Sequence, residues 1–256
     1  KVGFGICDLG GNLFFTIMGF YLLFFLTEIL GLEAGLAGLA LMVGKIWDAV
    51  SDPLVGAFSD RTKSRWGRRR PYMFIGSILL LLCMLLMFSN PGIDRQVPLF
   101  IWAAVVYCLL NTAYTLVNIP YGALTPELTP DFHERTVLNG YRMSFAVVGT
   151  LVGAAAVLPI VGLGGNPKSG WLLMGGVMGM IMLLTAFVTV FTVKEPVKER
   201  PAETRGIIKS YLSALRLKPF YTALIPWSCH ITGINVIQAS LLYYFKYIYN
   251  NEGAFQ

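Results

Sequence analysis

Long apolar runs separated by short polar segments dominate this sequence. Seven such runs fall at roughly 3–27, 35–58, 71–89, 98–123, 137–162, 170–193 and 220–248. A helix needs about 20 mostly apolar residues to cross a bilayer core of about 30 Å. Only 13% of the residues are charged, about half the share in an average soluble domain. The sequence therefore predicts an all-α membrane protein with several transmembrane helices, and it excludes a soluble fold.

The basic residues gather in alternate polar segments. Six lysines and arginines lie between the second and third runs and seven between the sixth and seventh. The segments after the first, third and fifth runs hold none, only Arg95 and only Lys168. Because basic loops stay in the cytoplasm, we expect a multi-pass protein of the cytoplasmic (inner) membrane with a cytoplasmic N-terminus. Membrane lipids with anionic head groups are the expected contacts of these clusters. The net charge of +6 is therefore not a sign of a nucleic-acid partner.

No arrangement of side chains suited to catalysis is visible. The four cysteines, Cys7, Cys83, Cys108 and Cys229, all lie in apolar runs and lack metal-ligand spacing. His133 and His230 are isolated, and the sequence contains no serine–histidine–aspartate set, phosphate loop or zinc motif. We therefore expect no enzymatic activity and no cofactor.

The chain divides into three expected parts. They are a six-helix transmembrane bundle at 1–193, a cytoplasmic linker at 194–219, and the first helix of a second bundle at 220–256. In the linker, apolar residues at helical spacing predict a short amphipathic helix on the membrane surface. This order matches half of a twelve-helix carrier with the start of the other half. The first residue is Lys1 rather than Met, which leaves open a fragment or the ordered part of a longer chain.

Two carboxylates lie inside the second run. Asp48 and Asp52 are four residues apart, so both project from one face of the helix. In a low dielectric, two such neighbours do not both stay ionised unless one takes a proton or a cation lies between them. The hydroxyl of Ser51 could add an oxygen ligand for Na⁺. Lys45 offers a different reading, a buried ion pair, but it would neutralise only one carboxylate.

Helix 1 carries a second polar pair. Asp8 and Asn12 lie one turn apart, with Gly10 and Gly11 between them. Small residues let another helix or a ligand approach closely. The pair is equally suited to ligand contact and to hydrogen bonds between helices.

Polar residues also interrupt the fourth, fifth and seventh runs. Pro120 tends to kink its helix and to free a carbonyl near Asn118, and Tyr121 follows it. Arg142 either extends its charge to the membrane interface or holds an oxygen-rich ligand with its planar fork. In the last run, Lys246 is expected to anchor the helix at the interface.

The segment Lys45–Pro53, Lys-Ile-Trp-Asp-Ala-Val-Ser-Asp-Pro, together with Ser64–Pro71, resembles the glycoside–pentoside–hexuronide:cation symporters, the melibiose permease family of the major facilitator superfamily. The resemblance continues through Thr27–Leu32 and Asn118–Ala123. It implies the superfamily's N-terminal six-helix bundle followed by helix 7. It also implies a protein, monomeric at full length, that couples sugar uptake to Na⁺ or H⁺ by alternating access.

The same resemblance implies residue roles at the cation site. Asp48 and Asp52 correspond to the carboxylates that bind the coupling ion, a metal site if that ion is Na⁺. Ser51 and Thr115 correspond to positions that assist them. Ser51 replaces an asparagine, which leaves the choice of cation open.

At the sugar site the resemblance is partial. Asn12 and Asn118 stand where the melibiose permease has acids, Gly122 stands where it has a tryptophan, and Arg142 is retained. Losing two negative charges beside an arginine would favour an anionic uronide, a hypothesis that Arg142→Lys would test. The expected substrate-binding residues are Asp8, Asn12, Asn118, Tyr121 and Arg142.

The loop after the second helix resembles the superfamily's signature. It reads Gly56–Arg61 and then Gly67–Arg69, lengthened by the residues at 62–66. The resemblance implies that Asp60, Arg61, Arg68 and Arg69 contact helix ends and bias the conformational switch. The alternatives are a carrier of another solute such as a lysolipid, a non-transporting sensor or scaffold, and, least supported, a membrane enzyme.

Overall fold

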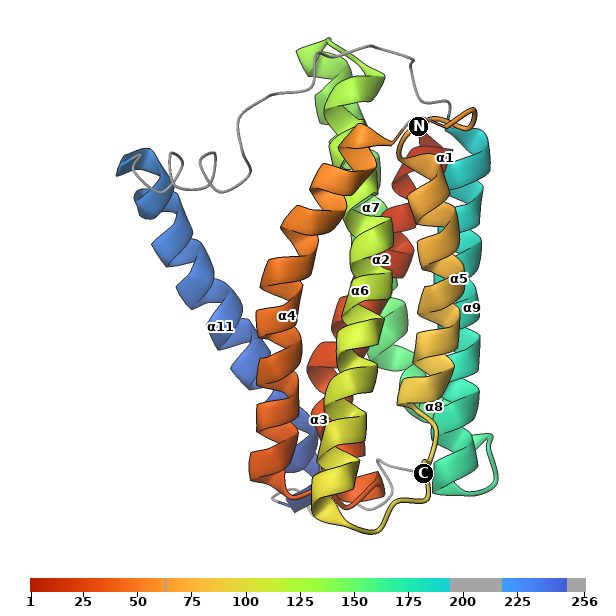
Figure 1. The fold of residues 1–256 in the computed structure, drawn as a ribbon, viewed down its shortest axis with the longest axis vertical. Coiled ribbons are helices and arrows are strands. Elements are labelled where there is room, and N and C mark those ends of the chain that lie inside the picture. Colours follow the sequence, from red (N-terminus) through yellow and green to blue (C-terminus); the bar gives the residue numbers. More distant parts are fainter. Residues whose placement is uncertain (63, 194–217, 248–256) are drawn as a thin grey trace.

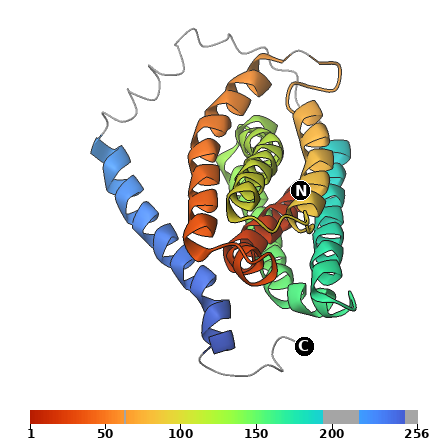
Figure 2. The same cartoon turned by 60° about the horizontal axis from the view of Figure 1, so that its bottom comes forward.

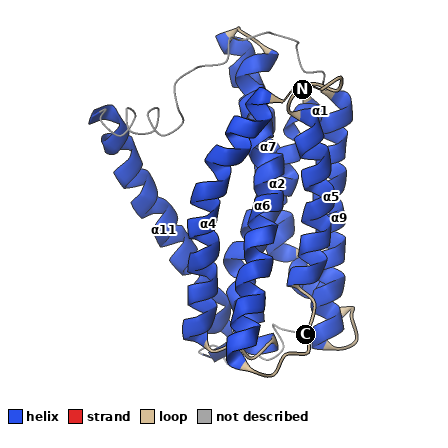
Figure 3. Ribbon diagram, in the orientation of Figure 1, coloured by secondary structure: helices blue, strands red, loops and turns tan. Residues whose placement is uncertain are grey.

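The computed structural model describes residues 1–62, 64–193 and 218–247, and all regular structure in these ranges is helical (Figure 3). The elements are α1 (Val2–Gly5), α2 (Cys7–Phe20), α3 (Leu22–Phe24), the π-helical turn η1 (Phe25–Ile29), α4 (Ala34–Arg61), α5 (Arg70–Met87), α6 (Gln96–Leu128), α7 (Phe132–Ala155), α8 (Val157–Gly162), α9 (Pro167–Thr192) and α11 (Lys218–Tyr247). The all-α prediction is confirmed. The expected amphipathic helix of the linker lies outside the described residues.

Two of the expected runs differ from the observed helices. The first is helical from Val2 to Ile29, but in four consecutive pieces, the last of them the π-helical turn. The fifth begins earlier than expected because Asp131 caps α7, its carboxylate accepting hydrogen bonds from the backbone N–H of His133 and of Glu134, the latter at 3.1 Å. That run is also interrupted at Ala156, between α7 and α8.

The helix α6 continues through two prolines in its interior. Pro120 and Pro126 lie inside the helix, which ends only at Leu128. The expected span of 98–123 is therefore confirmed and extended at both ends. Proline supplies no backbone N–H, so α6 lacks a helical hydrogen bond at each of these positions.

Within the described residues, five helical segments are long and apolar enough to cross a membrane: Val2–Phe20, Ala34–Arg61, Arg70–Met87, Gln96–Leu128 and Pro167–Thr192. The other two expected spans form the helices α7 and α11, which carry more polar residues, including Asn139, Arg142, Asn235 and Gln238. Large apolar side chains cover the outside of the bundle, with Ile46 59% and Phe58 61% exposed. Such a surface belongs in lipid, and the protein is a multi-pass membrane protein.

The helices form an upright bundle with its polar connections at two ends (Figure 1). We call the end with the N-terminus the basic end; it carries the segment Arg65–Arg70, the α6–α7 connection and the end of α9. The opposite end carries the α5–α6 connection, which contains Arg95, and the start of α9, which contains Lys168. Basic and weakly charged connections, which alternate along the sequence, therefore lie at opposite ends of the bundle.

The helix α2 packs between α7 and α9, while α6 packs against α4 and α5. A glycine permits the closest approach of α2 to α7: a Cβ at Gly149 would lie 2.3 Å from the Leu9 carbonyl oxygen. At the opposite end, the rings of Phe25 and Phe88 enclose the buried Trp171. The helix α11 lies outside the bundle, contacts α2 and α3, and diverges from α4 towards the basic end (Figures 1 and 2).

Candidate functional site

Asp48 and Asp52 meet a hydroxyl of the neighbouring helix. They lie one turn apart on α4, and Thr115 of α6 lies beside both. The Thr115 Oγ1 is 2.8 Å from Asp52 Oδ1 and 3.4 Å from Asp48 Oδ1. The Thr115 side chain is buried, and its single proton can serve only one carboxylate at a time. The structure thus brings together three of the four residues expected at the cation site.

The fourth expected residue, Ser51, is turned towards its own helix. Its hydroxyl is buried and donates to the Asp48 carbonyl oxygen at 3.3 Å. Lys45 approaches Asp48 Oδ2 only to 4.0 Å, and its side chain is 57% exposed. At 4.0 Å the contact is too long for a hydrogen bond, so Lys45 pairs with Asp48 only loosely. The described residues contain no group of three or more histidine, cysteine or acidic side chains able to hold a metal ion.

A second cluster joins α2, α6 and α7. Arg142 Nε donates to Asp8 Oδ2 at 2.6 Å, and its Nη2 lies 3.4 Å from Asp8 Oδ1. Arg142 Nη1 donates to Thr125 Oγ1 at 3.1 Å. The Tyr121 hydroxyl donates to Asp8 Oδ2 at 2.7 Å, and its ring lies under the guanidinium, 4.8 Å from Cζ. Arg142 therefore points into the bundle and does not extend to the interface.

Asn12 and Asn118 occupy different positions relative to this cluster. The Asn12 amide donates to the Asp8 carbonyl oxygen of its own helix at 2.9 Å. Asn118 lines a small cavity together with Asp8 and Tyr121. The cavity measures about 20 Å³, room for about one water molecule. Asp8, Asn118, Tyr121 and Arg142 thus lie together, whereas Asn12 is directed along α2.

A charged network closes the basic end of the bundle. Arg69 Nη2 donates to Asp60 Oδ1 and to Glu127 Oε1, each at 2.9 Å, and Arg68 Nη2 donates to the same glutamate oxygen at 2.5 Å. Arg69 and Glu127 are nearly fully buried, with 6% and 8% of their side chains exposed. Arg61 is exposed in the last turn of α4. Three of the four residues expected at the switch are therefore in one network.

Sequence reasoning did not identify Glu127 or Thr125. Both lie in the last turns of α6, beside Pro126, where the apolar run had been expected to have ended. An acid placed at a helix end that faces a loop of arginines is the signal that could have identified Glu127. Thr125 has no such signal, because its partner Arg142 is on another helix.

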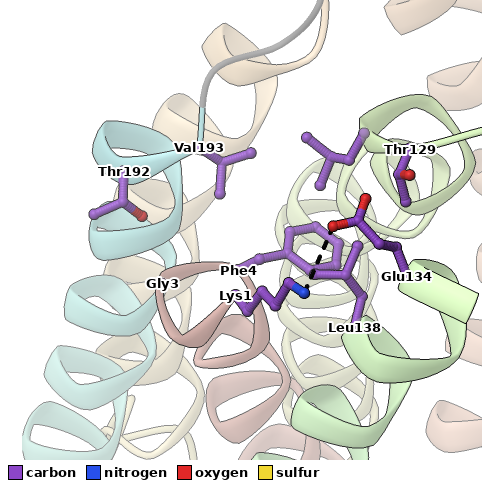
Figure 4. Close-up of a pocket in the computed structure, with 9 residues that line it drawn as sticks. Lys1, Gly3, Phe4, Thr129, Glu134, Leu138, Thr192 and Val193 are labelled. Atoms are coloured by element: carbon purple, nitrogen blue, oxygen red, sulfur yellow. Dashed lines mark ion pairs between the residues drawn. The ribbon is translucent and has the colours of Figure 1, made fainter. Parts of the chain in front are cut away.

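A larger cavity, about 290 Å³, lies at the basic end among the residues that Figure 4 draws. It is lined by residues of α1, α7 and the ends of α6 and α9. Lys1 Nζ lies 3.6 Å from Glu134 Oε1 across it (Figure 4). None of the expected site residues lines this cavity.

The helix α11 is held to the first helical run at the opposite end. Lys246 donates to Glu28, which also accepts from the Tyr247 hydroxyl at 2.9 Å. The hydroxyls of Thr27 and Tyr243 lie 2.6 Å apart. The Lys246 hydrogen bond holds the pKa of Glu28 below its usual value. Lys246 therefore pairs with a carboxylate of η1 in addition to lying near the helix end.

Comparisons with known proteins agree with this architecture. The family model described as MFS/sugar transport protein matches residues 3–256. The chain is 38% identical to an uncharacterised symporter of Synechocystis over 205 residues, which cover 78% of this chain and 38% of that protein. It is 29% identical to the isoprimeverose transporter of Lactiplantibacillus pentosus over 252 residues, 96% of this chain and 52% of that protein.

A vertebrate relative is also similar. The chain is 36% identical to the sodium-dependent lysophosphatidylcholine symporter 1-A of Danio rerio over 168 residues, 65% of this chain and 31% of that protein. The chain thus spans about a third to a half of the length of these relatives. With a family model that matches nearly every residue, an all-helical membrane bundle and the acidic motif of α4, the chain belongs to the MFS/sugar transport protein family.

Proposed function

We propose that the protein is a secondary active transporter that carries a glycoside, pentoside or hexuronide together with Na⁺ or H⁺. The observation that supports this proposal most directly is the presence of two charged clusters in one transmembrane bundle. One is Asp48, Asp52 and Thr115, and the other is Asp8, Arg142 and Tyr121. Ionisable groups inside a membrane are costly and mark ion and substrate pathways.

The first cluster has the chemistry of a site for the coupling ion. Two carboxylates one turn apart share a single hydroxyl donor, so in a low dielectric they gain from a proton or a monovalent cation between them. Hard cations prefer oxygen ligands, and carboxylate and hydroxyl oxygens are the groups present. The ion is carried as a substrate, and no resident cofactor takes part.

The second cluster has the chemistry of a sugar site. Arginine N–H groups donate to hydroxyl oxygens, carboxylates accept from hydroxyl hydrogens, and Asn118 can do both. Asp8, Asn118 and Tyr121 line one cavity, and Arg142 lies against the first and third of them. A polyhydroxylated ligand would satisfy these groups better than an apolar one.

Coupling would follow from alternating access. Ion binding at Asp48 and Asp52 favours sugar binding between the two halves of the complete transporter, which then rock around the loaded site. The network of Arg68, Arg69 and Glu127 would bias this switch at the basic end, which we place in the cytoplasm of an inner-membrane protein. At full length, we infer a monomer.

One relative supports a second candidate substrate. The lysophosphatidylcholine symporter is similar to this chain over 168 residues. A lysolipid carrier needs an apolar surface for the acyl chain, whereas the polar side chains of α2, α6 and α7 favour a sugar. A sensor would bind a sugar at the same site without transporting it. The uptake assay described next separates a transporter from such a sensor.

The test is uptake by weakly buffered bacterial cells that express the full natural chain. Glycosides, pentosides and uronides are added one at a time, with and without Na⁺, while external pH and labelled uptake are recorded. Alkalinisation, or uptake that depends on Na⁺, identifies the coupling ion and the substrate class. No coupled uptake of any sugar would overturn the proposal, and uptake of a labelled lysolipid instead would favour the second candidate.

A variant at the ion site tests coupling separately from binding. Asp52→Asn should reduce concentrative uptake at least about tenfold while sparing equilibrium exchange. The neutral amide no longer attracts the coupling ion, so ion binding no longer favours sugar binding. Asp94→Asn is the matched control, since Asp94 lies exposed in the α5–α6 connection. An equal fall of uphill and downhill flux in Asp52→Asn would contradict the assigned role.

A further inference from the structure

We propose that Asp8 selects substrates by charge: its carboxylate balances Arg142, so that the site favours neutral glycosides over hexuronides. This inference rests on the proposed function and decides between two of its substrate classes. Asp8 and Arg142 form a close ion pair inside the bundle, with Nε to Oδ2 at 2.6 Å. Only 13% of the Asp8 side chain and 19% of the Arg142 side chain are exposed.

The pair changes the expected charge of the substrate site. Arg142 considered without a partner, beside the amides of Asn12 and Asn118, would present an uncompensated positive charge to the substrate. Asp8 supplies one negative charge in direct contact with it. Arginine and aspartate together are neutral, and the positive charge that would attract a uronide is already compensated.

Bond counting shows which ligands the pair can still bind. Three of the five N–H groups of Arg142 are directed at Asp8 and Thr125. The remaining two can donate to sugar hydroxyls. Asp8 Oδ1 receives only the long contact from Nη2, at 3.4 Å, so it can accept from a sugar hydroxyl. A neutral sugar with neighbouring hydroxyls, once the small cavity beside Asp8 has opened to admit it, can therefore use both members of the pair.

An anionic sugar meets a penalty at the same place. A carboxylate oxygen bound by Nη2 would lie about 2.8 Å from it. Because Nη2 is 3.4 Å from Asp8 Oδ1, the two anions could be at most about 6 Å apart. At an effective dielectric constant of about 20, that repulsion lowers uronide affinity about a hundredfold relative to a site with Arg142 alone. Asp8 therefore removes most of the advantage that Arg142 alone would give a uronide, whereas the cost of taking the uronide carboxylate out of water remains. The net-neutral pair should therefore favour the neutral sugar.

The surrounding contacts allow this charge to be removed without dismantling the site. Thr125 still accepts from Arg142 Nη1. The Tyr121 hydroxyl has a second acceptor, the Phe4 carbonyl oxygen at 3.0 Å. In Asp8→Asn, the amide oxygen can still accept from Arg142 Nε while the negative charge is lost.

The experiment measures uptake of matched sugar pairs, a methyl glycoside and the corresponding uronide, by membrane vesicles that contain the full natural chain. Wild type should take up the neutral member of a pair at least about tenfold more efficiently. Asp8→Asn should raise the ratio of uronide to glycoside uptake by about tenfold or more. Asp8→Glu, which keeps the charge, and the double variant Asp8→Asn/Arg142→Gln, which removes both charges, should show no such rise.

Two results would overturn the inference. Wild type that prefers the uronide of a matched pair would refute it whether or not any variant folds. An unchanged ratio in an Asp8→Asn protein of normal membrane abundance would refute it as well. Absence of coupled uptake for every sugar would instead refute the proposed function, and this inference with it.

Discussion

The contact between Gly149 and Leu9 makes a quantitative prediction for the packing of α7 against α2. An alanine Cβ at Gly149 would lie 2.3 Å from the Leu9 carbonyl oxygen and 3.0 Å from two further backbone atoms of Leu9. Ordinary contacts begin near 3.4 Å, so Gly149→Ala should force the two helices about 1 Å apart. Backbone cannot move aside as a flexible side chain does.

The expected magnitude follows from two opposing effects. Overpacking of this kind costs about 1–3 kcal/mol, and alanine recovers up to about 1 kcal/mol through its higher helix propensity. Gly149→Ala should therefore lose about 1–2 kcal/mol. Gly140 lies on the same helix with no neighbouring atom within 4 Å of its added Cβ, so Gly140→Ala should gain about 0.5–1 kcal/mol.

The assay is thermal unfolding of the purified variants in detergent, followed by uptake measurements. A difference of about 1.5–3 kcal/mol corresponds to a melting temperature roughly 3–12 °C lower in Gly149→Ala than in Gly140→Ala. Since Leu9 follows Asp8, the same displacement should lengthen the ion pair to Arg142 and weaken substrate binding. Equal stability of the two variants would refute the packing argument.

Two further predictions concern the other clusters. Thr115→Val removes the hydroxyl 2.8 Å from Asp52 and should weaken Na⁺ binding about fivefold, near 1 kcal/mol, because an oxygen ligand is lost. If the coupling ion is H⁺, the same change should strengthen its binding, because the ionised carboxylate loses a hydrogen-bond donor. Thr150→Val, at an exposed site bonded to its own helix, should leave ion binding unchanged in an ion-titrated uptake assay. Glu127→Gln leaves the buried Arg69 and the partly buried Arg68 with less compensation and should cost about 3 kcal/mol of stability. Glu134→Gln, whose side chain is 51% exposed, should cost under about 1 kcal/mol in the same melting experiment.

The sequence predicted features that depend on local spacing better than features that depend on tertiary contact. The shared face of Asp48 and Asp52 follows from helical periodicity, and the resemblance indicated Thr115 as their partner. The pairing of Asp8 with Arg142 did not follow, because the two residues are 134 positions apart and meet only when α2 packs on α7.

Helix boundaries show the same difference between features set by local spacing and features set by tertiary contacts. Hydropathy located the apolar runs, but it does not detect a cap, so the start of α7 at Phe132 was missed although Asp131 specifies it. Hydropathy also ended α6 early, before the polar turn that contains Glu127. Glu127 is stabilised at the buried helix end by ion pairs with the arginines opposite it. Those partners lie in another segment, so the hydropathy of the α6 run alone does not indicate them.

The prolines of α6 give this helix an uneven stiffness. Thr115 belongs to the ion cluster, while Tyr121 contacts Asp8 and Glu127 contacts the arginines of the loop. These three side chains span about 18 Å of one helix. Pro120 divides Thr115 from the other two, and the carbonyl of Leu116 there lacks its helical donor. The helix can therefore bend between Thr115 and Tyr121, and Pro126 provides a second such point before Glu127. A displacement at one of these three side chains would thus reach the others through hinges instead of a rigid rod.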